Sequence, residues 1–185
     1  VVSLGYENTV DSDYNSLWIQ FLNAHIVCHD YGAEAASPYP TKELSIGVYI
    51  PSSQPELGSG AANYFGLMSD VVVHGATTSC WMTDLVNGWV IRNFSARGFY
   101  NQVMRLNGAY GNNIQFGFLE APYANGTVLL SFETKLNPSG PGHSSLESMY
   151  NVVLPFSAEL GHSAHIGILC DAGCQGNEAT IKLNA

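Results

Sequence analysis

The alternation of apolar and polar residues over short segments is the feature that most limits what this chain can fold into. Even-numbered positions are apolar throughout Leu44–Ile50 and at most places in Thr127–Leu136, and Ile114–Phe118 and Ala179–Leu183 alternate in a similar way. A strand with one apolar face and one polar face is typical of an antiparallel sheet that is half exposed to water. We therefore predict an all-β fold, an antiparallel β-sandwich of the jelly-roll or Ig-like type.

Further strands complete this sandwich in the prediction. They are expected near Ser16–Cys28, Val71–His74, Trp89–Asn93, Phe99–Leu106, Asn151–Phe156 and His165–Leu169. Glycine, proline, asparagine and serine separate these segments, as turns require. No sequence repeat or linker is evident, and 185 residues suit one sandwich. We expect residues 1–185 to form a single β-sandwich binding domain.

The charge of the chain excludes several classes of partner. Only 11% of the residues are charged, six residues are basic, and the net charge is −9. Binding to a phosphate backbone requires several cations on one face, so we expect no nucleic-acid partner. No apolar run approaches the roughly 20 residues of a membrane span, so we expect no insertion into a membrane.

The first residues of the chain and two sequons are compatible with export. The first residues, Val1-Val2-Ser3-Leu4-Gly5, lack an initial methionine, which indicates a processed mature chain or an excised domain. Asn93-Phe94-Ser95 and Asn125-Gly126-Thr127 fit the glycosylation pattern of secreted proteins. We predict an extracellular location: secreted, on a cell surface or on a virion surface.

Four cysteines allow three disulfide pairings. The favoured pairing joins Cys28 to Cys80, across two separate strands, and Cys170 to Cys174, around the tight turn that Gly173 permits. The alternative is that all four are free, buried thiols. An oxidising, extracellular environment favours the disulfides.

Aromatic and amide side chains supply the main indication of function. Aromatic rings cover the C–H faces of sugars, while Asp and Asn side chains bond to sugar hydroxyls. The candidate ligand-binding residues are Trp81, Asp84, Asn87, Trp89, Tyr110, Asn112, Tyr123 and Asn125. We expect them in loops at one end of the sandwich. The loops Ala33–Thr41 and Asn137–Ser145 are the alternative location for the binding site. The alternatives are that the tryptophans belong to the core and that the Asn-Gly pairs only form turns.

The sequence also contains residue types that are used in metal sites and in catalysis. His162, His165, Cys170 and Cys174 have the residue types of a zinc site. However, two histidines three positions apart on a strand point to opposite faces, so we expect neither a metal nor another cofactor. No known catalytic motif is present. Glu120 and Glu133 are the best candidates for the carboxylate pair of a glycosidase.

Short segments resemble the lectin domains of chaperone–usher fimbrial tip adhesins, in particular the N-acetylglucosamine-binding kind. The similar segments are Val2-Ser3, then Glu7-Asn8 with Val10, a strand with Trp18 that leads to Cys28, Cys80 about fifty residues later, and Ser131–Pro138. The resemblance implies an Ig-like or jelly-roll sandwich that binds host sugars and lacks enzymatic activity.

Taken together, these features predict an extracellular glycan- or receptor-binding (adhesion) domain that is not an enzyme. Its partner would be a glycan or a glycoprotein receptor. Two alternatives stay open: the receptor-binding head of a viral or phage fibre or spike, and a carbohydrate-active enzyme.

Overall fold

Strands joined by turns make up the part of the chain that the structure describes. In this computed structural model that part comprises residues 2–4, 16–17, 19–28, 46–51, 63–83, 86–120, 126–136, 145–146, 148–159 and 165–184. Its strands are β1 (Val2–Ser3), β2 (Ser16–Leu17), β3 (Gln20–Val27), β4 (Ile46–Ile50), β5 (Asn63–Tyr64), β6 (Leu67–His74), β7 (Thr78–Thr83), β8 (Val90–Arg97), β9 (Gln102–Asn107), β10 (Asn113–Glu120), β11 (Val128–Glu133), β12 (Lys135–Leu136), β13 (Ser145–Leu146), β14 (Val152–Glu159), β15 (Ile166–Cys170) and β16 (Glu178–Asn184). These segments include no helix long and apolar enough to cross a membrane.

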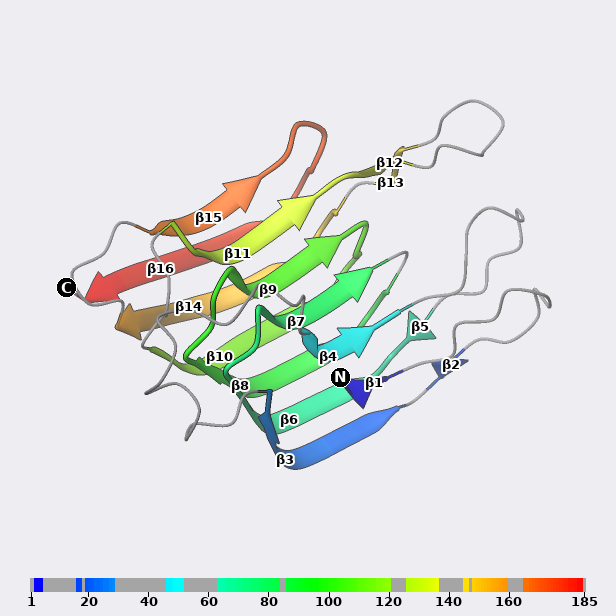
Figure 1. The fold of residues 1–185 in the computed structure, drawn as a ribbon. Coiled ribbons are helices and arrows are strands. Elements are labelled where there is room, and N and C mark those ends of the chain that lie inside the picture. Colours follow the sequence, from blue (N-terminus) through cyan, green and yellow to red (C-terminus); the bar gives the residue numbers. More distant parts are fainter. Residues whose placement is uncertain are drawn as a thin grey trace.

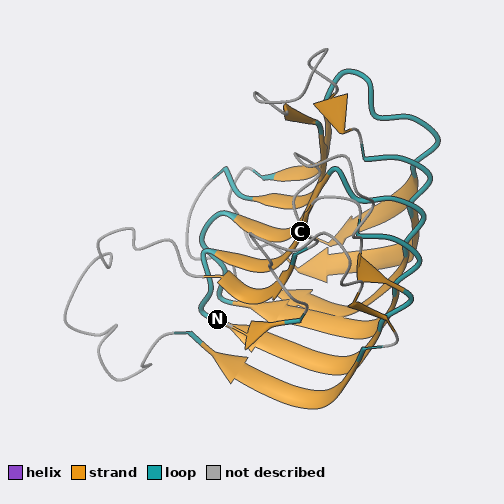
Figure 2. Ribbon diagram, turned by 90° about the vertical axis from the view of Figure 1, so that its right-hand side faces the viewer, coloured by secondary structure: helices purple, strands orange, loops and turns teal. Residues whose placement is uncertain are grey.

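Two parallel sheets of six strands each form the body of the molecule (Figure 1). The short-strand sheet has the order β1-β4-β7-β9-β11-β15, and the long-strand sheet has the order β16-β14-β10-β8-β6-β3. From β6 to β11 the chain passes from one sheet to the other with each successive strand. The backbone therefore winds as a coil whose turns stack on one another (Figure 2). This is a parallel β-solenoid, and we call each turn of the coil a rung.

The predicted antiparallel sandwich, whether jelly-roll or Ig-like, is wrong. Among the described strands, only the short pair β12 and β13 is antiparallel. Alternation shows that a strand has one buried face and one solvent-exposed face, but it does not show whether the neighbouring strand runs parallel or antiparallel. Parallel sheets are usually covered by helices on both faces. In a solenoid, each strand instead faces a shared core on one side and solvent on the other. The sandwich implied by the adhesin resemblance is overturned by the same parallel pairing.

A structural repeat sets the length of each rung. β6, β8 and β10 start at Leu67, Val90 and Asn113, each 23 residues after the one before, and these three residues are in register. β14 starts 39 residues after β10, and β16 starts 26 residues after β14, yet Asn113, Val152 and Glu178 stay in register. The unequal connections explain why no repeat was evident in the sequence.

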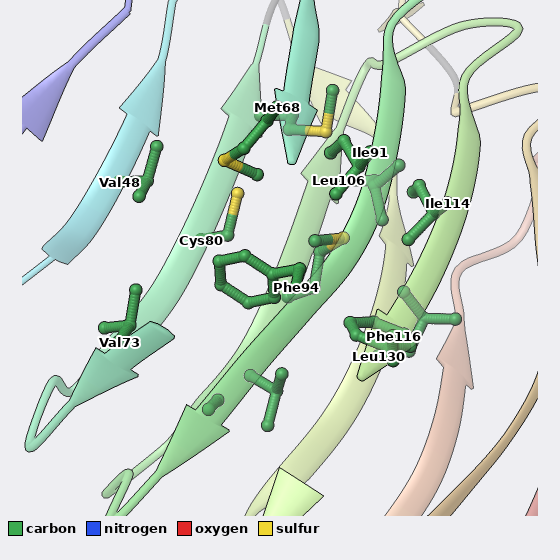
Figure 3. Packing of buried hydrophobic residues seen from close by; sticks show 14 of the residues in the cluster. Val48, Met68, Val73, Cys80, Ile91, Phe94, Leu106, Ile114, Phe116 and Leu130 are labelled. Carbon is green, nitrogen blue, oxygen red and sulfur yellow. The ribbon is translucent and has the colours of Figure 1, made fainter. Parts of the chain in front are cut away.

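The core lies between the two sheets and consists of columns of apolar side chains, one from each rung (Figure 3). Two columns are Met68-Ile91-Ile114-Val153 in the long-strand sheet and Val48-Cys80-Met104-Leu130 in the short-strand sheet. The ring of Phe116 lies 4.7 Å from that of Phe156 and 6.3 Å from that of Phe94, between centroids. Burial of these columns is the main term that stabilises the coil.

A hydrogen-bonded ladder runs through the interior just before the long strands. The backbone N–H of Trp89 donates to Oδ1 of Asn112 at 2.9 Å, and Nδ2 of Asn112 donates to Oδ1 of Asn151 at 2.8 Å. Nδ2 of Asn151 in turn donates to Oδ1 of Asn177 at 2.9 Å. Gly66 occupies the equivalent position just before β6. A larger residue does not fit there, because a Cβ on Gly66 would lie 2.2 Å from the ring of Trp89. The ladder satisfies buried polar groups at the point where the backbone turns.

Candidate functional site

Residues with a left-handed backbone conformation form a column at the corner where the backbone enters β6, β8, β10, β14 and β16. Its members are Phe65 (φ 57°), Gly88 (φ 68°), Gly111 (φ 62°), Tyr150 (φ 55°) and Gly176 (φ 64°). Glycine adopts this conformation at little cost, whereas a bulky side chain is uncommon there. The two aromatic members therefore stand out, since strained residues of this kind tend to cluster at functional sites.

The rings of Phe65 and Tyr150 project outward from this corner. Phe65 is 52% exposed and Tyr150 is 54% exposed. A Cβ on Gly88 would lie 2.9 Å from the ring of Phe65, and a Cβ on Gly176 would lie 2.5 Å from the ring of Tyr150. Each ring therefore rests on the glycine of the next rung. Between them, a Cβ on Gly111 would lie 3.1 Å from Oδ1 of Asn87 and would approach no other atom of the described residues within 4 Å.

The residues that precede this column add further aromatic and amide groups. Tyr64, Asn87, Tyr110 and Met149 are joined from rung to rung by parallel bridges. The ring of Tyr110 meets that of Tyr150 edge to face at 5.4 Å, and the ring of Tyr64 lies 5.8 Å from that of Phe65. We call Tyr64, Phe65, Tyr110 and Tyr150 the corner stripe. It runs along the axis of the coil with Asn87 at its middle.

An open groove of about 380 Å³ adjoins the first rungs of the corner stripe. It is lined by Ile19, Gln20, Phe65, Gly66, Leu67, Gly88, Val90 and Arg92. The walls are mostly apolar, while Gln20 supplies an amide and Arg92 a positive charge. Within the described ranges, Arg92 has no ion-pair partner. The groove therefore offers an apolar surface, a hydrogen-bonding group and a cation side by side.

Two of the predicted ligand-binding residues, Asn87 and Tyr110, lie on this surface. Asp84, Tyr123 and Asn125 lie outside the described residues, as do the loops Ala33–Thr41 and 137–144. The expected position at the end of a sandwich does not apply to a coil. The surface follows a corner of the coil instead.

Trp89 and Asn112 are interior residues, which contradicts their predicted role in binding. Trp89 is fully buried, and its Nε1 donates to Oδ1 of Asn63 at 3.0 Å. Asn112 is almost completely buried in the interior ladder. The alternative that a tryptophan belongs to the core is therefore correct for Trp89.

Trp81 lies on the short-strand sheet, away from the corner stripe. The guanidinium carbon of Arg105 sits 4.6 Å from the centroid of its ring, and the ring of Tyr49 lies 5.5 Å from it. These neighbours already cover much of a side chain that is half-buried. Trp81 therefore presents less free aromatic surface than the members of the corner stripe.

The two candidate carboxylates lie on different sheets, each with its own arginine. Glu120 on β10 accepts from Nε of Arg97 at 3.0 Å, and Glu133 on β11 accepts from the guanidinium of Arg105 at 2.7 Å. Burial by itself raises the pKa of Glu133, but the hydrogen bonds and charge supplied chiefly by Arg105 outweigh it and hold the pKa below its usual range. Glu120 and Glu133 therefore do not form the pair that a glycosidase requires.

Neither predicted disulfide is present, and all four cysteines are free thiols. Cys80 belongs to an interior column of the short-strand sheet, where burial raises its pKa strongly. Cys28 follows β3 at the edge of the long-strand sheet. Cys170 and Cys174 do come together beside an exposed turn, where partial burial and the neighbouring Cys174 thiol raise the pKa of Cys170. The structure thus supports free thiols, but of the four only Cys80 is buried as that alternative expected.

The histidines and cysteines do not combine into a metal centre in the described segments. No group of three metal-binding side chains is found among these residues. His165 is engaged through Nδ1 with the hydroxyl of Thr127 at 2.5 Å. His162 lies outside the described residues.

Sequence reasoning missed Phe65, Tyr150 and Arg92. Their proximity to the predicted residues depends on the stacking of rungs, which joins positions 23 or more residues apart. A signal was present: Gly88-Trp89, Gly111-Asn112 and Gly176-Asn177 repeat one corner motif, and Tyr150-Asn151 replaces its glycine with an aromatic residue.

Comparison with known proteins adds no family to this description. No protein-family model, no curated protein and no solved structure matches the chain at a significant level. The chemistry of the corner is therefore the basis for assigning a function.

Proposed function

We propose that this protein is an extracellular binding domain that recognises a glycan, either free or on a glycoprotein receptor, through the corner stripe. The observation that carries the proposal is the exposure of Phe65 and Tyr150 from left-handed backbone positions. Glycine occupies the same corner on the other described rungs at little conformational cost. A gain in binding explains why two rungs carry large rings instead.

The dimensions of the stripe suit a chain of sugar rings. Neighbouring rungs are about 4.8 Å apart, so Phe65 and Tyr150, three rungs apart, are separated by about 14 Å along the coil. A pyranose in an extended oligosaccharide advances by nearly the same distance as one rung. The stripe can therefore contact successive sugars, with Phe65 and Tyr150 stacking against two of them.

The polar groups of the stripe complement the aromatic rings. Asn87 lies between Tyr64 and Tyr110 in the bridged column, where its amide can both donate to and accept from sugar hydroxyls. This combination of ring faces and amides on a rigid scaffold is the chemistry that glycans require.

A glycan array with the purified chain tests the proposal, followed by titration of the strongest ligands against variants. Phe65→Asn and Tyr150→Asn remove a ring but keep a residue that tolerates the left-handed conformation. Each is expected to weaken binding about tenfold, the loss of one aromatic contact. Phe118→Ala is the matched control, because Phe118 is 47% exposed near the opposite end of β10.

Silence across a broad array, or binding that survives both stripe substitutions, contradicts the proposal. A stable trimer in light scattering that binds cells but no isolated sugar favours the receptor-binding head of a viral or phage fibre instead. Hydrolysis of a bound oligosaccharide would point to a carbohydrate-active enzyme.

A further inference from the structure

We infer that the groove beside Phe65 selects a carboxylated sugar, a uronic acid, through Arg92. This inference rests on the proposed glycan binding and assigns a ligand class to one end of the same surface. The remainder of the stripe would contact neutral sugars of the same oligosaccharide.

Arg92 differs from the other arginines in the absence of an internal partner. Arg97 pairs with Glu120, and Arg105 pairs with Glu133. Arg92 is exposed on β8 and, within the described part of the chain, forms neither an ion pair nor a hydrogen bond through its side chain. Its five N–H donors are therefore available to a ligand.

The carboxylate of Asp70, on the neighbouring strand β6, forms no ion pair with Arg92. Arg92 is in register with Ser69, which is followed by Asp70. Oδ2 of Asp70 accepts from the hydroxyl of Ser69 at 2.6 Å, and Oδ1 accepts from Nδ2 of Asn93 at 2.8 Å. These bonds hold the Asp70 carboxylate in place, and among the described residues no carboxylate forms an ion pair with Arg92.

The walls of the groove favour a charged sugar over a free ion. Phe65, Leu67 and Val90 provide apolar contacts for a sugar ring, and Gln20 provides an amide for its hydroxyls. A guanidinium binds a carboxylate through two parallel hydrogen bonds, with a planar geometry that an ammonium lacks. A uronic acid presents a ring and a carboxylate together, which fits this set of groups.

The charges along the first residues of the long strands restrict the acidic sugar to one end of the proposed binding surface. Leu67, Val90, Asn113, Val152 and Glu178 follow one another in register from rung to rung. The column thus begins at the groove with Arg92 close by and ends at an exposed glutamate. A uniform polyanion along the corner would meet Glu178, whereas an oligosaccharide with its acidic residue at the groove would not.

Calorimetric titration with matched oligosaccharides tests the inference. The probes are tetrasaccharides that carry one terminal uronic acid, the same tetrasaccharides with that carboxyl reduced to a hydroxymethyl group, and counterparts with a terminal sulfate. The intact chain is expected to bind the uronic acid form at least tenfold more tightly than the reduced form. This preference should shrink as salt is raised, because the charges meet near solvent.

Variants at two exposed arginines locate the preference. Arg92→Gln should lower affinity for the uronic acid form to that for the reduced form, while Arg92→Lys should keep only part of the preference. Arg97→Gln, which removes a charge further along the same strand, should leave the preference intact. Measured melting temperatures close to that of the parent chain will show that the variants are folded.

Three outcomes overturn the inference and leave glycan binding in place, provided that Phe65→Asn still weakens binding. They are equal affinity for the acidic and reduced probes, a preference that survives Arg92→Gln, and tighter binding of the sulfated probes. If the intact chain binds no probe and no glycan on the array, the inference and the proposed function fail together.

Discussion

Nδ2 of Asn112 donates a hydrogen bond of 2.8 Å to Oδ1 of Asn151, its counterpart on the next rung of the coil. Nδ2 of Asn112 also donates to the carbonyl of Val86 at 3.1 Å, while its Oδ1 accepts from the backbone of Trp89. One amide thus satisfies buried polar groups on both neighbouring rungs. Such a network stabilises the fold only while it is complete.

Asn112→Ala should therefore destabilise the protein by about 2–4 kcal/mol, because it leaves several buried groups without partners. Chemical denaturation followed by fluorescence measures the change. Asn113→Ala is the control, since Asn113 is the next residue, is exposed at the start of β10 and should change stability by less than about 0.5 kcal/mol. A small effect at Asn112 would mean that the ladder contributes little.

The same substitution at two tryptophans separates a core residue from a surface residue. Trp89→Phe loses volume in the core and the hydrogen bond to Asn63, and we expect a cost of about 2–3 kcal/mol. Trp81→Phe removes an Nε1–H that has no partner among the described residues, so we expect less than about 1 kcal/mol. Equal costs in urea denaturation would contradict these placements.

The four thiols should differ in reactivity. Burial raises the pKa of Cys80, which suppresses the thiolate, so a thiol reagent should label it only after denaturation. Cys170 is exposed and next to Cys174, so oxidised glutathione should join these two through a mixed disulfide, with release of two molecules of reduced glutathione. Mass spectrometry of the digested protein identifies the product. A disulfide between Cys28 and Cys80 would contradict the fold.

The Arg105–Glu133 pair should contribute to stability in a manner that depends on pH. The folded pKa of Glu133 lies below its usual range, so the contribution is present above the unfolded value, about 4.3, and is lost as pH falls through the folded value. Glu133→Gln should cost about 1–3 kcal/mol at pH 7, because Glu133 is only 14% exposed. The cost should shrink below pH 4.

Glu120→Gln is the matched control for this pair. Glu120 and Arg97 are 32% and 53% exposed, and surface pairs of this kind contribute about 0.5 kcal/mol. Denaturation curves of both variants between pH 3 and pH 7 make the comparison. A cost for Glu133→Gln that does not change with pH would show that packing, rather than charge, holds Glu133 in place.

The positions of the strands could be predicted from alternation, but the direction of their pairing could not. The expected segments Leu44–Ile50 and Ala179–Leu183 overlap β4 and β16. The alternation of apolar and polar residues depends only on which face of a strand is exposed to solvent. Pairing depends on the connection that follows each strand, and here every long strand pairs with the equivalent strand of the next rung.

The candidate site was predictable only in part for a related reason. Asn87 and Tyr110 were predicted to bind a ligand as polar and aromatic turn residues. Tyr110 belongs to the corner stripe and Asn87 lies at its middle. Phe65 and Tyr150 come into line with them only because the rungs stack. Asn112 was misassigned because an asparagine that follows glycine resembles an exposed turn residue in sequence, whereas here the corner points it inward.

The register between β10 and β14 is kept although 39 residues separate their first residues, compared with 23 between β8 and β10. Additional residues can thus enter between strands without altering the cross-section of the coil. In evolutionary terms, the interior and the connections of this protein can vary separately. A lineage with this architecture can diversify what the molecule recognises by lengthening connections, while the stacked columns preserve a stable body.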